Sequence, residues 1–360
     1  MDTVGEERRS VVIDLGSGTL KAGFGGDVVP RAVFPSVVGA GRGGRYVGAE
    51  AMAKQSLLKM SYPVQHGIIV SWDDAVTLLR HTFQNELRAD PAECNVLVTE
   101  PPLNPKANRE KLIQVLFDTF RVPACYVACT SVLSLRASGC TTGLVLESGD
   151  DVTRAVPVYD GYIQPEAVGR LSLAGRDLTG YLARLLRPAG LASTERETAR
   201  EIKEMLCYVS VDPEADGTKV RPCGYALPDG NIISVGDARF MCPEALFTPD
   251  LIGLDEPGLA TVAYGALQKT DPGIRNELYG NIVLAGGSTM FDHLDDRLLQ
   301  ELTSLAPAVP KISVVAPPER TFSAWIGGSI LSSLSTFATQ WITRAEYDRT
   351  GPSVVTARCP

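Results

Sequence analysis

The chain has 360 residues, a length that suits two lobes of ordinary size better than one compact core. Apolar residues make up 44% of it, a globular balance, and the net charge of −8 argues against a protein that tracks nucleic-acid phosphates. No apolar run approaches the roughly 18 residues that would cross a bilayer, and residues 1–10 are too polar for a signal peptide. We expect a soluble intracellular chain with no membrane span and no nucleic-acid partner.

The eight cysteines do not predict a metal site or a disulfide framework. Cys125 and Cys129 are four residues apart and would share a helix face, but no second pair at ligand spacing accompanies them. The three histidines are scattered along the chain. We therefore expect reduced, mostly structural thiols, with Cys359 as an exposed and accessible exception.

Apolar runs predict short strands at 11–14, 32–38 and 96–99, with helices between them. Further along, Asn104 reads as a helix cap and Pro105 as the first turn of that helix.

Two helices follow from the spacing of apolar residues. Leu112, Leu116 and Phe120 recur every four residues, as in an amphipathic helix. The segment 126–138 also has helical spacing, and it ends at Gly139, a typical helix terminator.

An internal repeat is the most informative feature of the sequence, because residues 11–21 superpose on residues 144–154 without a gap. In that register an acid, a turn glycine and a cation recur in both halves: Asp14 and Glu147, Gly16 and Gly149, Lys21 and Arg154. Two such hairpins, about one lobe apart, indicate a duplicated architecture with facing loops. Chance similarity over eleven positions is the alternative.

The first hairpin turn suits an anion, because residues 15–18 offer backbone N–H groups and the glycines allow close approach. Asp14 would repel a phosphate unless a divalent cation lay between them, so Asp14, the turn and Lys21 together predict a metal–triphosphate site. A plain hairpin closed by glycines is the alternative. Asp150 and Asp151 in the second turn are acids that we expect around a cation or facing water.

Two further elements support a nucleotide site. Residues 282–290 read as a strand that runs into Gly286 and Gly287 and then a helix start, where backbone can approach a nucleotide closely. Arg200, Lys203 and Glu204 share one face of a charged helix. For that helix, a solvated surface is the alternative interpretation.

Nearly the whole chain, from about residue 11 to the C-terminus, resembles the actin family in order and with few gaps. Six segments carry the resemblance: 27–36, 99–110, 171–179, 242–247, 316–320 and 325–337. The resemblance implies the fold shared by actins, sugar kinases and heat-shock chaperones. This is an α/β, two-lobed, actin-like ATPase fold with duplicated RNase-H-like lobes, four subdomains and a nucleotide cleft between the lobes.

The resemblance also implies domain boundaries, with hinges near Ala137 and Thr321. Subdomain 1 would comprise 1–34, 63–137 and 323–360, and subdomain 2 would comprise 35–62. Subdomain 3 would comprise 138–173 and 255–322, and subdomain 4 would comprise 174–254.

By position, the resemblance implies which residues bind ATP or ADP with Mg²⁺ or Ca²⁺. The cation would be held by Asp14 and Glu147, through water. The phosphate loops would comprise Asp14, Leu15, Gly16, Ser17, Gly18, Lys21 and Asp150. The base and ribose pocket would comprise Arg200, Lys203, Glu204, Gly286, Gly287, Ser288 and Met290.

Four departures from actin bear on hydrolysis. Thr130 stands where actins usually carry a water-positioning glutamine, and Arg154 where they have a histidine. Glu147 replaces an aspartate near the metal, and Asp151 replaces a glycine near the γ-phosphate. Phosphoanhydride hydrolysis depends on positioning and electrostatics, so we expect a nucleotide binder with weak or absent ATPase activity and assign no catalytic residue.

Two other departures bear on self-assembly. Segment 39–45 holds four glycines and two arginines and is shorter by roughly ten residues than the actin loop that inserts into the next subunit. Segment 249–263 keeps the length of actin's interstrand plug, but Pro257 alters it. The acidic N-terminal cluster that actins offer to motors is missing. Ordinary filament growth is therefore expected to be impaired.

One surface of the actin family is retained, the groove in which partners place amphipathic helices. Its matching positions are Gly139, Thr141, Tyr162, Leu331 and Leu334. Arg136 replaces an aromatic residue there, which changes the expected partner. Alternatively, the two leucines face the core.

The leading hypothesis is an actin-related structural subunit in a cytoplasmic cytoskeletal assembly, such as a flagellar, sperm or motor-associated one. Its expected partners are cytoskeletal or motor-associated proteins and other actin-family subunits. A divergent polymerising actin with ATPase activity is the alternative. A small-molecule kinase on the same scaffold is a third possibility, but no sugar-kinase motif positions an acid for it.

Overall fold

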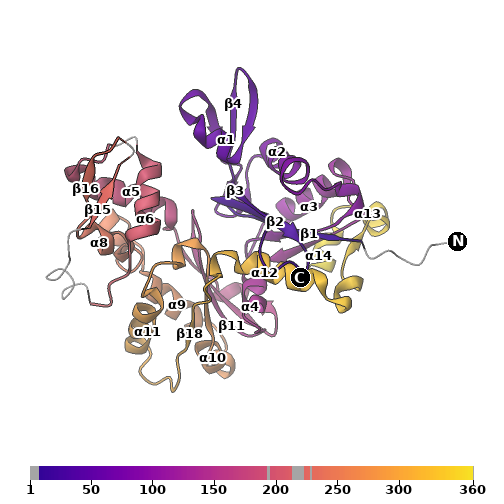
Figure 1. Cartoon of the computed structure of the whole chain (residues 1–360). Coiled ribbons are helices and arrows are strands. Elements are labelled where there is room, and N and C mark those ends of the chain that lie inside the picture. The colour runs from indigo at the N-terminus through magenta and orange to yellow at the C-terminus, as the bar shows by residue number, and fades with distance from the viewer. Residues whose placement is uncertain (1–7, 193–194, 213–222, 228, 360) are drawn as a thin grey trace. The chain divides into compact units, whose positions relative to one another are not determined.

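The computed structural model describes residues 8–192, 195–212, 223–227 and 229–359 (Figure 1). The chain divides into two compact units, each a mixed α/β assembly, as the sequence predicted. Unit 1 comprises Met1–Thr141, Asp160–Pro165 and Phe322–Pro360, and unit 2 comprises Thr142–Tyr159 and Glu166–Thr321. Among the described residues, no helix is long and apolar enough to cross a membrane.

Unit 1 is built on a six-stranded sheet in the order β19-β10-β9-β1-β2-β3. Its strands are β1 (Ser10–Leu15), β2 (Thr19–Phe24), β3 (Ala32–Pro35), β9 (Asn95–Glu100), β10 (Ala124–Cys129) and β19 (Ile342–Thr343). Strand β1 runs antiparallel to β2 and parallel to β9. Residues Val11, Val12 and Ile13 are buried in succession, because a strand inside such a sheet is covered on both faces.

Unit 1 contains seven α-helices among the described residues, most of which cover this sheet, whereas α1 packs on the small sheet described below. They are α1 (Gly48–Ala53), α2 (Trp72–His81), α3 (Lys106–Gln114), α4 (Thr130–Ala137), α12 (Ser323–Ser333), α13 (Arg344–Thr350) and α14 (Val354–Arg358). Helices α12 and α4 pack closely, and a side chain at Gly327 would collide with the backbone of Leu133. Trp325 Nε1 donates to Val12 O at 3.0 Å and fixes α12 on the sheet.

A small sheet in the order β5-β4-β6 forms a separate part of unit 1. Its strands are β4 (Val38–Gly41), β5 (Gly44–Val47) and β6 (Lys59–Ser61). The predicted single strand over 32–38 is therefore wrong in its extent. Strand β3 ends at Pro35, because proline has no N–H with which to continue a ladder, and β4 pairs with different partners. Two short strands, β7 (Val64–Gln65) and β8 (Ile68–Ile69), form a hairpin.

Unit 2 contains the strand order β12-β11-β17-β18, with β14 paired to β12. The strands are β11 (Gly143–Ser148), β12 (Thr153–Tyr159), β14 (Gly169–Leu171), β17 (Ile282–Ala285) and β18 (Val314–Val315). A separate hairpin joins β15 (Gly224–Ala226) and β16 (Ile232–Ser234). The helices are α5 (Gly175–Leu185), α6 (Arg196–Leu206), α8 (Ala238–Glu244), α9 (Leu259–Gln268), α10 (Pro272–Tyr279) and α11 (Leu294–Leu305).

The internal repeat is confirmed as two hairpins of the same construction. Strand β1 pairs antiparallel with β2 and parallel with β9, and β11 pairs antiparallel with β12 and parallel with β17. The structure adds the cross-strand partners, which are equivalent in the two hairpins: Asp14 with Lys21, and Glu147 with Arg154.

The predicted helix over 126–138 is wrong in its first four residues, 126–129. Residues Ala124–Cys129 form strand β10, and only Thr130–Ala137 are helical. Cys125 and Cys129 therefore lie on a strand rather than on a helix face. Strand β10 is largely buried, and a short apolar run of that kind has no period that separates strand from helix.

The predicted cap of the next helix also needs correction. Pro105 is the N-cap of α3 rather than a residue of its first turn, and no side-chain cap is made. Asn104 instead donates from Nδ2 to Glu100 Oε2 at 2.9 Å. Leu112, Leu116 and Phe120 are all buried, as expected.

Cys359 was expected to be exposed, and this expectation is wrong. Its side chain is 0% exposed, and Sγ accepts a hydrogen bond from Val127 N at 3.5 Å. Its carbonyl accepts from Arg109 Nη2, so the C-terminal segment is docked on β10 and α3. Burial raises the pKa of the Cys359 thiol to about 12, which makes it a poor nucleophile.

Candidate functional site

The turn after β1 is held from both sides within unit 1. Ser17 Oγ accepts from Gly67 N at 2.9 Å, and Gly18 O accepts from Ser36 N at 3.0 Å. A side chain at Gly16 would meet Thr19 O at 2.8 Å, so glycine is needed for this tight turn. The turn therefore consists of small residues held in place by hydrogen bonds. It follows the buried Leu15, the last residue of β1.

Asp14 is a buried carboxylate at this turn, only 6% exposed. Lys21 Nζ donates to Asp14 Oδ2 at 3.0 Å, and Thr99 Oγ1 donates to Asp14 Oδ1 at 2.7 Å. Thr99 comes from β9, the parallel neighbour of β1. The acid and the cation that the sequence selected are thus brought together, and Thr99 is a partner that the sequence reading did not select.

The turn after β11 joins a second set of predicted residues in unit 2. Gly149 O accepts from Gly175 N at 3.0 Å and from Ser288 Oγ at 2.6 Å. Lys203 Nζ donates to Gly175 O at 2.8 Å. Four segments therefore meet at one point: the β11–β12 turn, α5, α6 and the segment after β17. No space remains there for a side chain at Gly175.

Arg176 is the main residue of this region that the sequence reading missed. Its Nη2 and Nε donate to Asp150 Oδ2 at 2.7 and 3.1 Å, and its Nη1 lies 3.3 Å from Asp151 Oδ1. The two acids of the turn thus face a guanidinium of the same chain. A signal was present, because a cation in the first turn of a helix is unfavourable without acids nearby.

Lys203 is buried, with 7% of its surface exposed, and burial lowers the pKa of its ammonium. The interpretation of this helix as a wholly solvated surface therefore fails at Lys203. Glu204 is exposed, and Arg200 pairs with Glu197 on the same helix at 2.9 Å. The three predicted residues do not act as one cluster here, since only Lys203 reaches the turn.

The segment after β17 is a short 3₁₀ turn at Gly287–Thr289. Gly286 has φ +88°, and a side chain there would collide with Ser148. Arg320 supports the turn by donating from Nη2 to Thr289 O at 2.9 Å. Gly287 and Met290 are exposed, so a ligand can reach this backbone.

Thr130 and Arg154 occupy well-defined places. Thr130 is the first residue of α4 in unit 1. Arg154 lies on β12 opposite Glu147 in unit 2, and Thr153 beside it is anchored by Ser148 Oγ at 2.7 Å. Neither carries an amide or an imidazole that would orient a water molecule.

In the described ranges, three or more His, Cys, Asp or Glu side chains do not gather into a metal-binding group. Carboxylates are nevertheless the hard oxygen donors that Mg²⁺ and Ca²⁺ prefer. Asp14 and Glu147 each carry such a donor near the end of a strand that leads into a glycine turn.

The five residues of the predicted partner groove all belong to unit 1. Tyr162 on β13 (Tyr162–Ile163) is 61% exposed and Leu334 is 40% exposed, whereas Leu331 packs partly against the cluster around Trp325. Thr141 O accepts from Gly161 N at 2.8 Å, and Gly139 has φ +77°. Leu334 is therefore available at the surface, and Leu331 is shared with the core.

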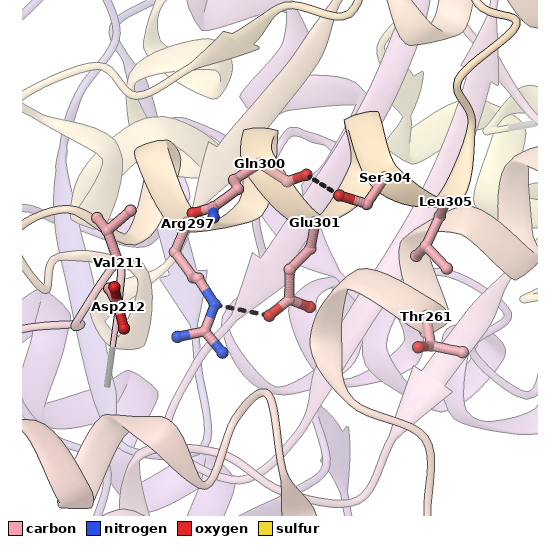
Figure 2. Close-up of a pocket in the computed structure, with 8 residues that line it drawn as sticks. All are labelled: Val211, Asp212, Thr261, Arg297, Gln300, Glu301, Ser304 and Leu305. Atoms are coloured by element: carbon pink, nitrogen blue, oxygen red, sulfur yellow. Dashed lines mark hydrogen bonds and ion pairs between the residues drawn. The ribbon is translucent and has the colours of Figure 1, made fainter. Parts of the chain in front are cut away.

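A pocket of about 710 Å³ lies elsewhere in unit 2, beside α11 (Figure 2). Arg297 at its edge donates from Nε to Glu301 Oε1 at 2.6 Å and from Nη2 to Glu244 Oε1 at 2.9 Å. The pocket is lined by Val211, Asp212, Thr261, Arg297, Gln300, Glu301, Ser304 and Leu305. These are not residues that the sequence selected, and the arginine is already engaged by carboxylates.

Comparison with protein families gives a match along nearly the whole chain. The family model described as Actin matches residues 5–194 and 191–360.

Proposed function

The chain belongs to the actin family, and from this premise we propose that it binds ATP or ADP with Mg²⁺ or Ca²⁺ and serves as a structural subunit of a larger cytoskeletal assembly. The pair of equivalent hairpins is the observation that carries this proposal. Each hairpin presents a glycine turn directly after an acid that faces a cation across the strands. Such turns suit a cation-bridged polyphosphate.

In this proposal each of the two turns contributes to nucleotide binding. The β1–β2 turn binds phosphate oxygens through its backbone N–H groups, and Lys21 Nζ donates to Asp14 Oδ2 at 3.0 Å and so fixes the position of that carboxylate. The buried Lys203 and the exposed backbone at Gly287 contact the base and ribose, together with Met290. A bound divalent cation would neutralise phosphate charge, with Asp14 and Glu147 reaching it through water.

We also propose that hydrolysis is weak or absent. The positions that would orient the attacking water hold Thr130 and Arg154, a hydroxyl and a guanidinium. A guanidinium is always charged and cannot accept a proton from water. Binding depends on the turns and survives this change, whereas turnover depends on a positioned water.

Self-assembly into an ordinary filament is proposed to be impaired, because the segment 39–45 forms a tight hairpin bound to its own unit. Arg45 Nη1 lies 3.2 Å from Asp74 Oδ1 and donates to Thr77 Oγ1 at 2.9 Å, both on α2. The turn at Arg42 and Gly43 offers no apolar side chain for insertion into a neighbour.

The groove defined by Gly139, Thr141, Tyr162, Leu331 and Leu334 is proposed to bind an amphipathic helix of a cytoskeletal or motor-associated protein, or of another actin-family subunit. Exposed Tyr162 and Leu334 support this assignment. A cytoplasmic, cytoskeletal location follows from such partners, with flagellar assemblies among the candidates. The four-subdomain division remains part of this proposal.

Two measurements on the purified full chain test the proposal. Acid extraction followed by chromatography is expected to recover about one adenine nucleotide per chain. Sedimentation over rising protein concentration, with phosphate release followed in parallel, is expected to show no threshold for pelleting. Extraction that returns no nucleotide would remove the binding claim. Pelleting with phosphate release above a critical concentration would instead identify a polymerising ATPase.

A further inference from the structure

The turn after β11 carries two adjacent acids, Asp150 and Asp151, and both are bound by Arg176. Nitrogens on both arms of the guanidinium are used: Nε and Nη2 donate to Asp150, and Nη1 lies 3.3 Å from Asp151. The Asp151 side chain is only 13% exposed. Since an arginine has five N–H donors in a fixed fork, most of its capacity to hold a further anion is already committed within the protein.

The backbone N–H groups at the start of α5 are also already hydrogen-bonded within the protein. Gly175 N donates to Gly149 O at 3.0 Å, and Arg176 N donates to Asp150 O at 2.7 Å. Amides at the start of a helix normally favour an anion, but these two are bound to the carbonyls of the turn. We call Arg176 with Asp150 and Asp151 the Arg176 clamp. Together with these backbone hydrogen bonds, the clamp holds the β11–β12 turn against the start of α5.

The charge of the clamp is unfavourable for an additional phosphate. Two carboxylates and one guanidinium leave one net negative charge at the clamp. Glu147 on the preceding strand has Arg154 as its register partner on β12. Lys203 is the further buried cation of this region, and its ammonium is turned to Gly175 O at 2.8 Å. A third phosphate placed at this turn would add negative charge next to Asp151, and the guanidinium of Arg176 is already bound by the two acids.

From this geometry we infer that the Arg176 clamp makes the site selective for a nucleoside diphosphate over the triphosphate, with Asp151 as the specificity-determining residue. This inference rests on the proposed nucleotide function. Asp151 acts by repelling the terminal phosphate and by holding Arg176 away from it. One like charge near a partly buried phosphate corresponds to a change in affinity on the order of tenfold.

The experiment measures the affinities of ADP and ATP, each with Mg²⁺, for the full chain by displacement of fluorescent etheno-ADP. The native chain is expected to bind ADP about tenfold more tightly than ATP. Asp151→Asn removes the charge but keeps an acceptor for Arg176, so the preference is expected to fall toward equality, mainly through tighter ATP binding. Asp250→Asn, an exposed acid of the same unit, is the matched control and should leave the preference unchanged.

The outcomes separate this inference from the proposed function. Equal affinities, or a preference for ATP, in the native chain would overturn the inference and leave the nucleotide function standing, whether or not any variant folds. An unchanged ADP preference in Asp151→Asn would likewise overturn the role of Asp151. Failure of the native chain to bind either nucleotide would overturn both.

Discussion

Asp14 and Lys21 face each other across β1 and β2, with Lys21 Nζ 3.0 Å from Asp14 Oδ2. Glu147 and Arg154 occupy the same register on β11 and β12. The same arrangement therefore occurs twice in this chain: an acid on the strand before a glycine turn lies opposite a cation on the strand after it. Each hairpin also has a parallel neighbour on its first strand, β9 beside β1 and β17 beside β11.

Substitution of Lys203 is predicted to weaken nucleotide binding without lowering the thermal stability of the protein. Burial lowers the pKa of its ammonium, so the charged form is unfavourable in the folded protein. Lys203→Met should leave the melting temperature of the nucleotide-free protein unchanged or raise it, while weakening nucleotide binding about tenfold or more. Calorimetry and etheno-ADP titration measure the two effects. Lys269→Met, at an exposed lysine of the same unit, is the control, and equal effects of both variants would contradict a binding role.

The departures at Thr130 and Arg154 predict a gain of function. Thr130→Gln together with Arg154→His should raise the rate of phosphate release from bound ATP by at least tenfold, since a positioned water contributes on that order or more. The rate is measured in a single-turnover assay with the nucleotide in excess over its Kd. If the native chain already hydrolyses as fast as the double variant, weak hydrolysis is not a consequence of these residues.

A buried ion pair predicts a pH-dependent loss of stability in unit 1. Glu100 accepts from Arg109 Nε at 3.0 Å, and Arg109 Nη2 lies 2.8 Å from its other oxygen. Arg109→Met should cost about 3 kcal/mol at neutral pH, because Glu100 is then a buried charge without its partner. Denaturant unfolding measures this loss, and Arg109→Met with Glu100→Gln should recover part of it.

The sign of the pH dependence follows from Glu100. Burial raises the pKa of its carboxyl above the ordinary value, so the folded state favours the protonated form and this contribution to stability is lost as the pH rises through the folded pKa. Removal of Arg109 takes away a cation that lowers the pKa of Glu100, so the loss of stability with rising pH becomes larger. The loss caused by Arg109→Met should therefore shrink as the pH is lowered toward the ordinary carboxyl range. A loss that grows on acidification would contradict it.

The docked C-terminus predicts an unreactive thiol at Cys359. Iodoacetamide should modify the partly exposed Cys140 and Cys223 in the native protein, but Cys359 only after denaturation, because it is buried and its pKa is raised to about 12. Peptide mapping by mass spectrometry checks the order of modification. Arg109→Met, which removes a bond to the Cys359 carbonyl, should speed native labelling of Cys359.

The hairpins could be predicted from the sequence because their information is local. Each stretch was expected to hold a strand, an acid, a glycine turn and a returning strand with a cation, and the structure has a hairpin of that order in both places. The two-lobed α/β class followed from the repeat and from the family resemblance. Strand β9 was also predicted within one residue at each end.

Features set by tertiary packing were not predictable in the same way. Arg176 and Thr99 lie far along the chain from the acids that they bind, so spacing gives no indication of the contact. Strand β10 was read as a helix because a largely buried strand lacks a polar face. Cys359 was read as exposed from its position near the C-terminus, whereas docking on Val127 decides its burial.

The most direct test of the central claim measures nucleotide stoichiometry and affinity in three proteins: the native chain, Asp14→Asn and Glu147→Gln. The account predicts one site for Mg²⁺-bound adenine nucleotide per chain, and a loss of about tenfold or more in affinity in each single variant at that same site. Calorimetric titration reports both quantities. A loss of affinity in only one of the two variants would contradict the claim that both hairpins are needed for nucleotide binding.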